Sequence, residues 1–256
     1  ADLPDLVGKL PSPKVIWIML PAGKPVAETL EALGALLGPG DLVVDGGNTH
    51  YRDDVTRAEK LQSRGVRFMD AGVSGGVWGL QEGYCLMLGG ASADFQALEP
   101  LLKTLAPADG YLHCGPVGAG HFVKMIHNGV EYALMEAYGE GFELLQASPY
   151  GGELALQKVA ALWNRGSVVR SWILELLEAA LARNHDLAGV SGHVEDSGEG
   201  RWTVEQAVAD GVDATNIAQA LFKRFRSRRA ETFSDKVVAA LRNEFGGHGV
   251  HGANPK

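Results

Sequence analysis

The chain has 256 residues, of which 46% are hydrophobic and 21% charged, a composition typical of a globular protein with a large buried core. Its formal net charge of −8 argues against non-specific nucleic-acid binding, which needs a basic surface. Two cysteines are too few for a disulfide framework or a zinc site. The longest apolar run, residues 15–20, is far shorter than a membrane span of about 18 residues, and no secretory signal is present. We therefore expect a cytoplasmic protein without nucleic-acid or membrane partners.

Short apolar runs alternate with amphipathic stretches along the N-terminal part, which indicates a parallel sheet with crossover helices. We expect strands at residues 15–19, 42–45, 67–70, 85–88 and 110–113, and helices at residues 25–37, 51–63 and 93–105. Ligands of open α/β sheets gather at the carboxyl ends of the strands. The segments Asp45-Gly-Gly-Asn48 and Gly72-Val-Ser-Gly-Gly76 are therefore candidate binding loops.

Helical spacing replaces the strand pattern after Gly115-Pro116. We expect helices at residues 119–146, 154–163, 171–182, 204–211 and 214–241, the last one broken, and an extended Gly- and His-rich tail. The predicted architecture is an α/β, Rossmann-like domain over residues 1–116, followed by an all-α domain over residues 117–256.

The α/β part contains no Gly-x-Gly-x-x-Gly fingerprint after a strand. The segment Gly115-Pro-Val-Gly118-Ala-Gly120 has a different spacing, and we interpret it as a turn that caps the long helix. The chain also begins at Ala1 rather than at a methionine. We therefore expect an incomplete dinucleotide-binding domain that lacks its first βαβ unit, and the sequence does not distinguish NAD from NADP.

A polar stripe runs along the predicted helix at residues 119–146. At 100° per residue, Lys124, His127, Asn128 and Glu131 fall within about 100° of one another on the helix surface. Such a stripe is usually a solvated face, but apolar residues flank this one. Gly129 lies inside the helix, where it costs roughly 1 kcal/mol relative to alanine and indicates the close approach of another element. We therefore predict that the stripe belongs to an active site.

Two glycine-rich segments at neighbouring strand ends support this prediction. Asp45-Gly-Gly-Asn48 and Val73-Ser-Gly-Gly76 each have the composition of a simple tight turn. Their pairing favours a functional interpretation, because consecutive glycines allow the backbone to approach a ligand closely.

Together these segments resemble the decarboxylating 6-phosphogluconate dehydrogenases of the pentose phosphate pathway. The resemblance is carried by Lys124-Met-Ile-His-Asn-Gly-Val-Glu-Tyr132, by Asp45-Gly-Gly-Asn-Thr-His-Tyr-Arg-Asp53 and by Gly72-Val-Ser-Gly-Gly76. The segment Asp196-Ser-Gly-Glu-Gly-Arg-Trp-Thr203 matches the form found in the shorter bacterial enzymes of this family. The matches cover nearly the whole chain and occur in the family's order.

The resemblance implies a role for individual side chains. Lys124 matches the general base and Glu131 the general acid, and Asn48 matches a residue between the nicotinamide and the substrate. Trp202 sets the register for a phosphate ligand at Arg224. The implied substrate contacts are Asn48, Ser74, Gly75, Gly76, His127, Asn128, Tyr132, Arg224, Arg242 and His248, the last two reaching the substrate phosphate of a neighbouring subunit.

The implied reaction is the oxidation and decarboxylation of 6-phosphogluconate to ribulose 5-phosphate and CO2, with NADP or NAD as the cofactor and no metal. Lys124 would take the proton of the C3 hydroxyl, and Glu131 would protonate C1 after CO2 is lost. A phosphate site completed by a second subunit implies a homodimer or homotetramer.

Two other functions agree with the residues. A non-decarboxylating β-hydroxyacid dehydrogenase would share the two-domain plan and the helix lysine, but would need neither Glu131 nor the distal Arg242 and His248. A non-catalytic binding or dimerisation module would agree with the missing dinucleotide fingerprint.

Overall fold

The computed structural model describes residues 2–246, and these residues form two compact units. The first unit comprises the described residues up to Tyr132 together with Gly198–Ile217. The second unit comprises Ala133–Ser197 and the described residues from Ala218 onward. Within this part of the chain, no helix is long and apolar enough to cross a membrane.

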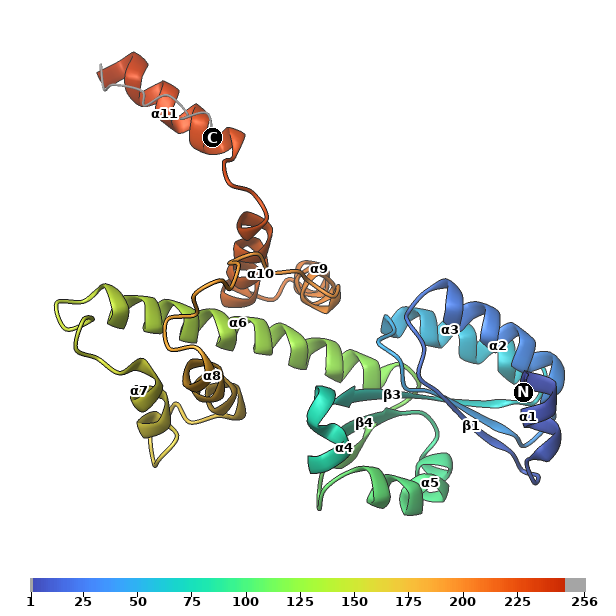
Figure 1. Ribbon diagram of the computed structural model, residues 1–256. Coiled ribbons are helices and arrows are strands. Elements are labelled where there is room, and N and C mark those ends of the chain that lie inside the picture. The colour runs from blue at the N-terminus through green and yellow to red at the C-terminus, as the bar shows by residue number, and fades with distance from the viewer. Residues whose placement is uncertain (1, 247–256) are drawn as a thin grey trace. The chain divides into compact units, whose positions relative to one another are not determined.

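The elements of the first unit form a sheet with flanking helices (Figure 1). In chain order they are α1 (Leu3–Lys9), β1 (Val15–Ile18), α2 (Lys24–Leu36), β2 (Leu42–Asp45), α3 (Tyr51–Gln62), β3 (Arg67–Ser74), the 3-10 helix η1 (Gly76–Trp78), α4 (Gly79–Glu82), β4 (Cys85–Gly89), α5 (Ser92–Leu105), β5 (Tyr111–Gly115), the first half of α6 (Ala119–Ala147) and α9 (Glu199–Asp210). The predicted strands agree with the observed ones to within a few residues, except that β3 is four residues longer.

The five strands lie in the order β1-β2-β3-β4-β5. β1, β2 and β3 are parallel to one another, but β4 is antiparallel to β3, so the predicted parallel sheet contains one antiparallel pair that the sequence did not indicate. Only residues 75–84 connect β3 to β4, and a parallel pair needs a crossover of a dozen or more residues. The chain returns to a parallel pairing at β5, after the crossover helix α5.

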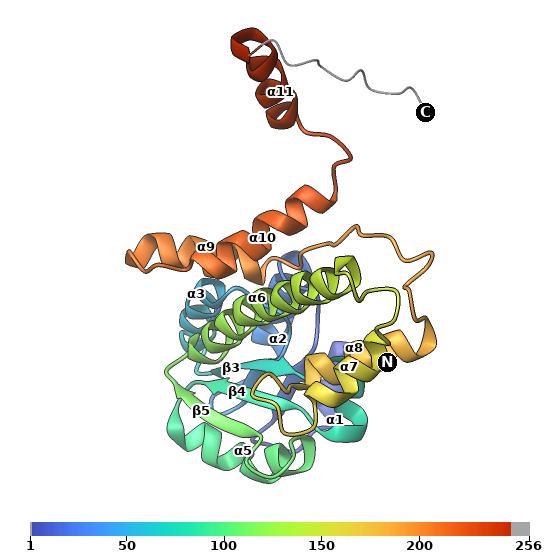
Figure 2. The same cartoon turned by 90° about the vertical axis from the view of Figure 1, so that its left-hand side faces the viewer.

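Separate apolar clusters cover the two faces of this sheet. α2 and α3 lie on one face and α5 on the other (Figures 1 and 2). β2 contributes to both clusters, because successive side chains of a strand point to opposite faces of the sheet. Val43 belongs to the cluster under α2 and α3, whereas Leu42 and Val44 belong to the cluster that contains Leu98 and Leu102 of α5.

A buried carboxylate fixes the start of α6 to the sheet. Asp70, fully buried in β3, accepts hydrogen bonds from the backbone N–H groups of Gly118 (2.6 Å) and His121 (2.8 Å). Gly118 has a φ of 92°, which favours glycine. The segment from Gly115 to Gly120 therefore is the helix-capping turn that its sequence predicted.

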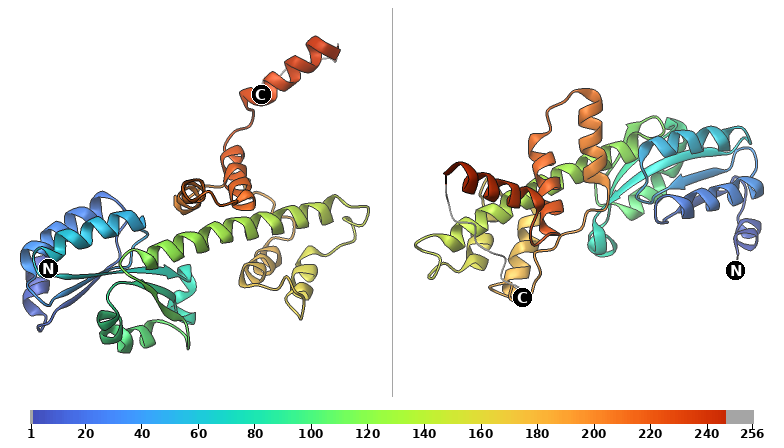
Figure 3. Two further views of the ribbon diagram at one scale, coloured as in Figure 1. Left: turned by 180° about the vertical axis from the view of Figure 1, so that it is seen from behind. Right: turned by 90° about the horizontal axis from the view of Figure 1, so that it is seen from above.

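The second unit is helical, as predicted. It contains the second half of α6, α7 (Leu156–Trp163), α8 (Trp172–Arg183), most of α10 (Thr215–Ser227) and α11 (Phe233–Gly246). α7 and α8 lie side by side (Figure 3), and Phe142 of α6 joins Ala160, Leu174 and Leu181 in their core. The predicted long helix at residues 214–241 is broken between α10 and α11. The predicted tail lies outside the described residues.

A second buried carboxylate, Asp54 of α3, lies beside the start of α6. Its Oδ2 is 2.7 Å from Nδ1 of His121, and both side chains are almost fully buried. Burial raises the pKa of Asp54 to about 6, although the bond and charge of His121 oppose the rise. Burial lowers the pKa of His121, but the bond to Asp54 and the charges of Asp54, Asp70 and Asp45 outweigh it, so that the pKa is raised.

We predict that this pair makes the folded state less stable as the pH rises. Folding raises the pKa of Asp54 from 3.8 to about 6, so its stabilising contribution is full below pH 3.8 and is lost as the pH rises through about 6. The pKa of His121 is raised as well, so its contribution to stability is also lost as the pH rises. Relative to Asp54→Asn, the wild type should lose up to about 3 kcal/mol of unfolding free energy between about pH 4 and pH 7, measured by urea denaturation. A difference in unfolding free energy between the two proteins that stays constant with pH would contradict the raised pKa of Asp54.

Candidate active site

The turn after β2 is held by the carboxylate of Asp45, which is fully buried. Its Oδ1 accepts the N–H of Gly47 (3.0 Å) and its Oδ2 accepts the hydroxyl of Thr49 (2.9 Å). Nη1 of Arg57 lies 3.5 Å from the same Oδ2 and balances the charge. This network fixes the backbone on both sides of Asn48, whose side chain is half-buried.

The two glycines of this turn serve packing within the protein. A Cβ on Gly46 would lie 2.3 Å from Nε1 of Trp17, and a Cβ on Gly47 would lie 2.5 Å from the carbonyl oxygen of Leu20. These distances are too short for a side chain, so only glycine allows the turn to lie against the end of β1. The close approach predicted for these glycines is therefore made by the protein's own atoms.

The loop after β3 contributes the second predicted segment. Ser74 ends β3, four residues beyond the position that pairs with the end of β2, and its Oγ lies 3.4 Å from Nε2 of His127 in α6. Gly75 and Gly76 have φ angles of 134° and 53°, which side-chain-bearing residues rarely adopt. A Cβ on Gly76 would meet no atom within 4 Å, so its backbone is open to a ligand.

Lys124 lies where these elements meet. A Cβ on Gly72 of β3 would lie 2.4 Å from Cβ of Lys124, so glycine is required for α6 to run this close to the sheet. Nζ of Lys124 donates to Oδ1 of Asn48 (2.5 Å) and to Oε1 of Glu199 (2.9 Å). The side chain is 11% exposed. An amine held in a polar, nearly enclosed site can exchange a proton with a bound hydroxyl.

The other residues of the stripe follow along α6. Nδ2 of Asn128 donates to Oε1 of Glu199 (2.8 Å), so Oδ1 of Asn128 faces Nδ1 of His127 at 2.9 Å. In neutral His127 this leaves the proton on Nδ1 and directs the lone pair of Nε2 towards Ser74. Glu131 is half-buried, about 10 Å from Lys124 along the helix axis, and Tyr132 is buried.

Glu199 is the site residue that the sequence analysis missed. It is the first residue of α9 and is 2% exposed, yet it lies 75 positions from Lys124 in the chain. Its segment was matched to a family motif, but its role was not assigned. Its sequence context could have identified it, because Glu199 stands between Gly198 and Gly200, just before Trp202. An acidic residue between two glycines can lie close to another element.

α9 packs closely against α6. A Cβ on Gly129 would lie 2.7 Å from Cγ2 of Thr203, and a Cβ on Gly200 would lie 2.4 Å from the ring of Tyr132. The hydroxyl of Thr203 also lies 2.8 Å from the carbonyl oxygen of Met125, to which it donates. The close approach of another element that we predicted from Gly129 is therefore confirmed. The residue that packs against Gly129 is Thr203 of α9.

The predicted phosphate ligands lie in the second unit. Arg224 of α10 is half-buried, and its Nη1 donates to the carbonyl oxygen of Glu195 (2.9 Å). Arg242 of α11 is exposed, and His248 lies outside the described residues. Their roles at the site remain predictions.

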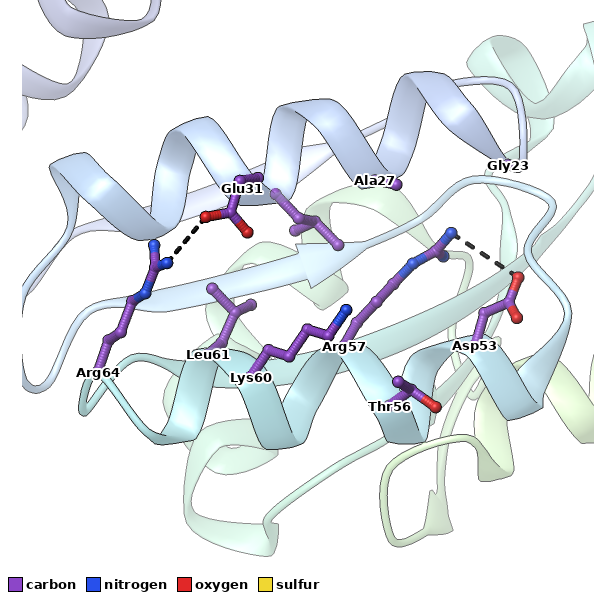
Figure 4. Close-up of a pocket in the computed structure, with 10 residues that line it drawn as sticks. Gly23, Ala27, Glu31, Asp53, Thr56, Arg57, Lys60, Leu61 and Arg64 are labelled. Carbon is purple, nitrogen blue, oxygen red and sulfur yellow. Dashed lines mark hydrogen bonds and ion pairs between the residues drawn. The ribbon is translucent and has the colours of Figure 1, made fainter.

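A separate concavity of about 290 Å³ lies between α2 and α3 (Figure 4). Arg64 and Glu31 form an ion pair (2.8 Å) at one end, and Arg57 and Asp53 form a longer one (3.8 Å) at the other. Its lining contains basic and acidic side chains but none of the predicted site residues. This groove is therefore separate from the predicted site around Lys124.

Comparison with known families matches both parts of the chain. The model of the NAD binding domain of 6-phosphogluconate dehydrogenase matches residues 1–117, and that of the 6-phosphogluconate dehydrogenase C-terminal domain matches residues 120–245. An NAD(+)-dependent, decarboxylating 6-phosphogluconate dehydrogenase of Haloferax volcanii is 46% identical over 96% of this chain and 81% of its own length. A decarboxylating 6-phosphogluconate dehydrogenase of Synechococcus elongatus is 38% identical over 88% of this chain and 50% of its own length.

Solved structures share the fold. The 6-phosphogluconate dehydrogenase of Plasmodium falciparum has a TM-score of 0.80 at 24% identity, covering 96% of this chain and 53% of the other. The 3-hydroxyisobutyrate dehydrogenase of Mycobacterium tuberculosis has a TM-score of 0.69 at 24% identity, covering 93% of this chain and 82% of the other. The Rossmann-like sheet followed by helices is thus confirmed.

We predict that Gly129→Ala destabilises the protein by about 1–3 kcal/mol. The added methyl group would lie 2.7 Å from Thr203 and would push α9 away from α6, which outweighs the better helix propensity of alanine. Gly139→Ala is the matched control, because a Cβ there meets no atom within 4 Å in the same helix. The control should be neutral or up to about 1 kcal/mol more stable by urea denaturation. Equal effects would contradict the packing role of Gly129.

Proposed function

The chain belongs to the 6-phosphogluconate dehydrogenase family, and from this membership we propose that it converts 6-phosphogluconate to ribulose 5-phosphate and CO2 with reduction of NAD or NADP. The observation that carries the proposal is the position of Lys124. Its amine lies among Asn48, Glu199 and Asn128, at the carboxyl edge of a sheet that matches an NAD binding domain.

The site fits the nicotinamide end of the cofactor. Asn48 follows the carboxyl end of β2, is half-buried and contacts Lys124, so an amide group lies beside the amine. We propose that Asn48 lies between cofactor and substrate. Bound NAD or NADP supplies the acceptor for the hydride that leaves C3.

Lys124 acts on the C3 hydroxyl of the substrate in the proposed mechanism. Neutral Lys124 takes the hydroxyl proton as the C3–H bond breaks, which leaves a ketone at C3 and an ammonium on Lys124. The ammonium then donates a hydrogen bond to that ketone, which stabilises the negative charge that develops as CO2 leaves. A β-keto acid loses CO2 readily, so this step requires no metal.

Glu131 completes the reaction from the next turns of α6. It protonates C1 of the enediol, and its position about 10 Å along the axis places it towards the other end of a short substrate. We propose that Ser74, Gly75 and Gly76 hold the carboxylate and hydroxyls, with His127, Asn128 and Tyr132. The open backbone at Gly76 and the contact between Ser74 and His127 support this arrangement.

We further propose that residues 1–116 hold the cofactor and residues 117–256 form the substrate and dimerisation domain, in the cytoplasm. Arg224, Arg242 and His248 would bind the substrate phosphate, with Arg242 and His248 supplied by a second subunit of a homodimer or homotetramer. Large apolar side chains remain exposed on α11, including Phe233 (81%) and Phe245 (79%), which supports association with another copy.

We predict that CO2 is released from 6-phosphogluconate in step with NAD(P)H formation, and that Lys124→Met lowers kcat by at least about 1000-fold while substrate still binds. The substitution removes the proton acceptor but keeps an unbranched side chain that is only one atom shorter. Headspace CO2 and absorbance would be followed with 6-phosphogluconate and, in parallel, with 3-hydroxyisobutyrate. Turnover of the second acid without CO2 would indicate the non-decarboxylating alternative, and near-normal turnover by the variant would refute the role of Lys124.

We also predict that two inactive variants restore one another. A subunit carrying Lys124→Met retains Arg242, and a subunit carrying Arg242→Ala retains Lys124, so a mixed dimer holds one complete site. Mixing equal amounts after partial denaturation should recover about a quarter of the wild-type rate, because half of the dimers are mixed. Each variant treated alone is the control. A mixture no more active than its components would show that Arg242 does not act across subunits.

A further inference from the structure

We propose that Glu199 is a positioning residue for the reaction, which orients Lys124 and Asn128 towards the substrate. This inference rests on the proposed function. One oxygen of the carboxylate, Oε1, accepts a hydrogen bond from Nζ of Lys124 (2.9 Å) and another from Nδ2 of Asn128 (2.8 Å). A single acceptor therefore ties together the amine and the amide that leave the same face of α6, one turn apart.

The backbone that carries Glu199 is packed closely against α6. The hydroxyl of Thr203 lies 2.8 Å from the carbonyl oxygens of both Glu199 and Met125, and the bond that it donates to Met125 links the first turns of α9 to the backbone of α6. Gly129 and Gly200 allow the two helices to approach to side-chain contact. A carboxylate on such a support can fix the direction of a flexible lysine, which alone has several rotatable bonds.

The geometry around Nζ of Lys124 shows how its two hydrogen bonds orient the amine. Nζ of Lys124 is tetrahedral, with Cε at one corner and three directions left for hydrogen atoms or a lone pair. Asn48 and Glu199 take two of these directions. The remaining direction is thereby fixed, and the substrate hydroxyl has to lie along it to lose its proton to Lys124. Orientation of this kind contributes strongly to rate, since small misplacements of reacting groups are costly.

A purely structural role would not require this position. An acidic residue in the first turn of a helix is favoured by the helix dipole, and it has the same benefit when its side chain faces solvent. Glu199 is instead 2% exposed and paired with Lys124, and buried ion pairs are poor contributors to stability because both charges lose their hydration. Its placement therefore fits the orientation of Lys124 better than the stabilisation of α9.

Kinetics of three proteins test the proposal. Glu199→Ala removes the acceptor and should lower kcat by about 100-fold while KM rises much less, because Lys124 loses its orientation whereas Asn128 is one of several proposed substrate contacts. Glu199→Gln keeps an oxygen at Oε1 and should retain kcat within about tenfold of the wild type. The proposal fails if the alanine variant stays within about threefold, or if glutamine loses as much as alanine, which would mean that charge rather than position matters.

A second measurement is independent of turnover and so separates this proposal from the proposed function. Competitive acetylation with acetic anhydride, read by mass spectrometry, should label Lys124 about tenfold faster in Glu199→Ala, because the amine loses its tether. Glu199→Gln should stay close to the wild type, and exposed Lys24 is the internal control. Equal labelling of Lys124 in all three proteins would refute the proposal. A wild type that binds and oxidises no sugar acid would refute the proposed function alone.

Discussion

The carboxylate of Asp70 joins the sheet to α6, the helix that bears Lys124. It lies inside β3 and accepts two backbone N–H groups at the start of α6, where a helix leaves its first donors without partners. These two hydrogen bonds hold the first turn of α6 against β3. Gly72, two residues further along β3, then allows Lys124 to come down onto the sheet. From this position the amine of Lys124 contacts Asn48 and Glu199.

The arrangement places several carboxylates in surroundings with little water. Burial raises the pKa of Asp70, although the N–H groups of Gly118 and His121 oppose the rise. Asp54 is balanced by His121, and Asp45 by Arg57 and Thr49. Asp70 fixes the start of α6 and Asp45 the turn that carries Asn48 through backbone N–H groups, whereas Asp54 links α3 to α6 through the side chain of His121. The first unit thus uses buried charge to define loop geometry, at a cost in solvation.

The sequence predicted most of the elements because their patterns are local. β2 was predicted to the residue, since a β-branched run bounded by turn residues has one simple interpretation. Helical spacing grouped Lys124, His127 and Asn128, and their side chains do lie together, linked through Glu199 and Asn128. The direction of β4 was missed because strand pairing depends on the length of the β3–β4 connection, which contains the short helices η1 and α4. Local pattern cannot show Glu199 either, since its partner is 75 residues away.

The separation of Lys124 and Glu199 in the chain has a consequence for the order in which the protein assembles. Each strand of the sheet pairs only with its neighbours in sequence, so the contacts of β1 to β5 close short loops and can form as the chain is synthesised. The contact between α6 and α9 closes a far longer loop, and it does so only after Ala133–Ser197 have been made. The contact between Lys124 and Glu199 therefore forms late, and a nascent chain that already has its sheet still lacks this partner of the lysine.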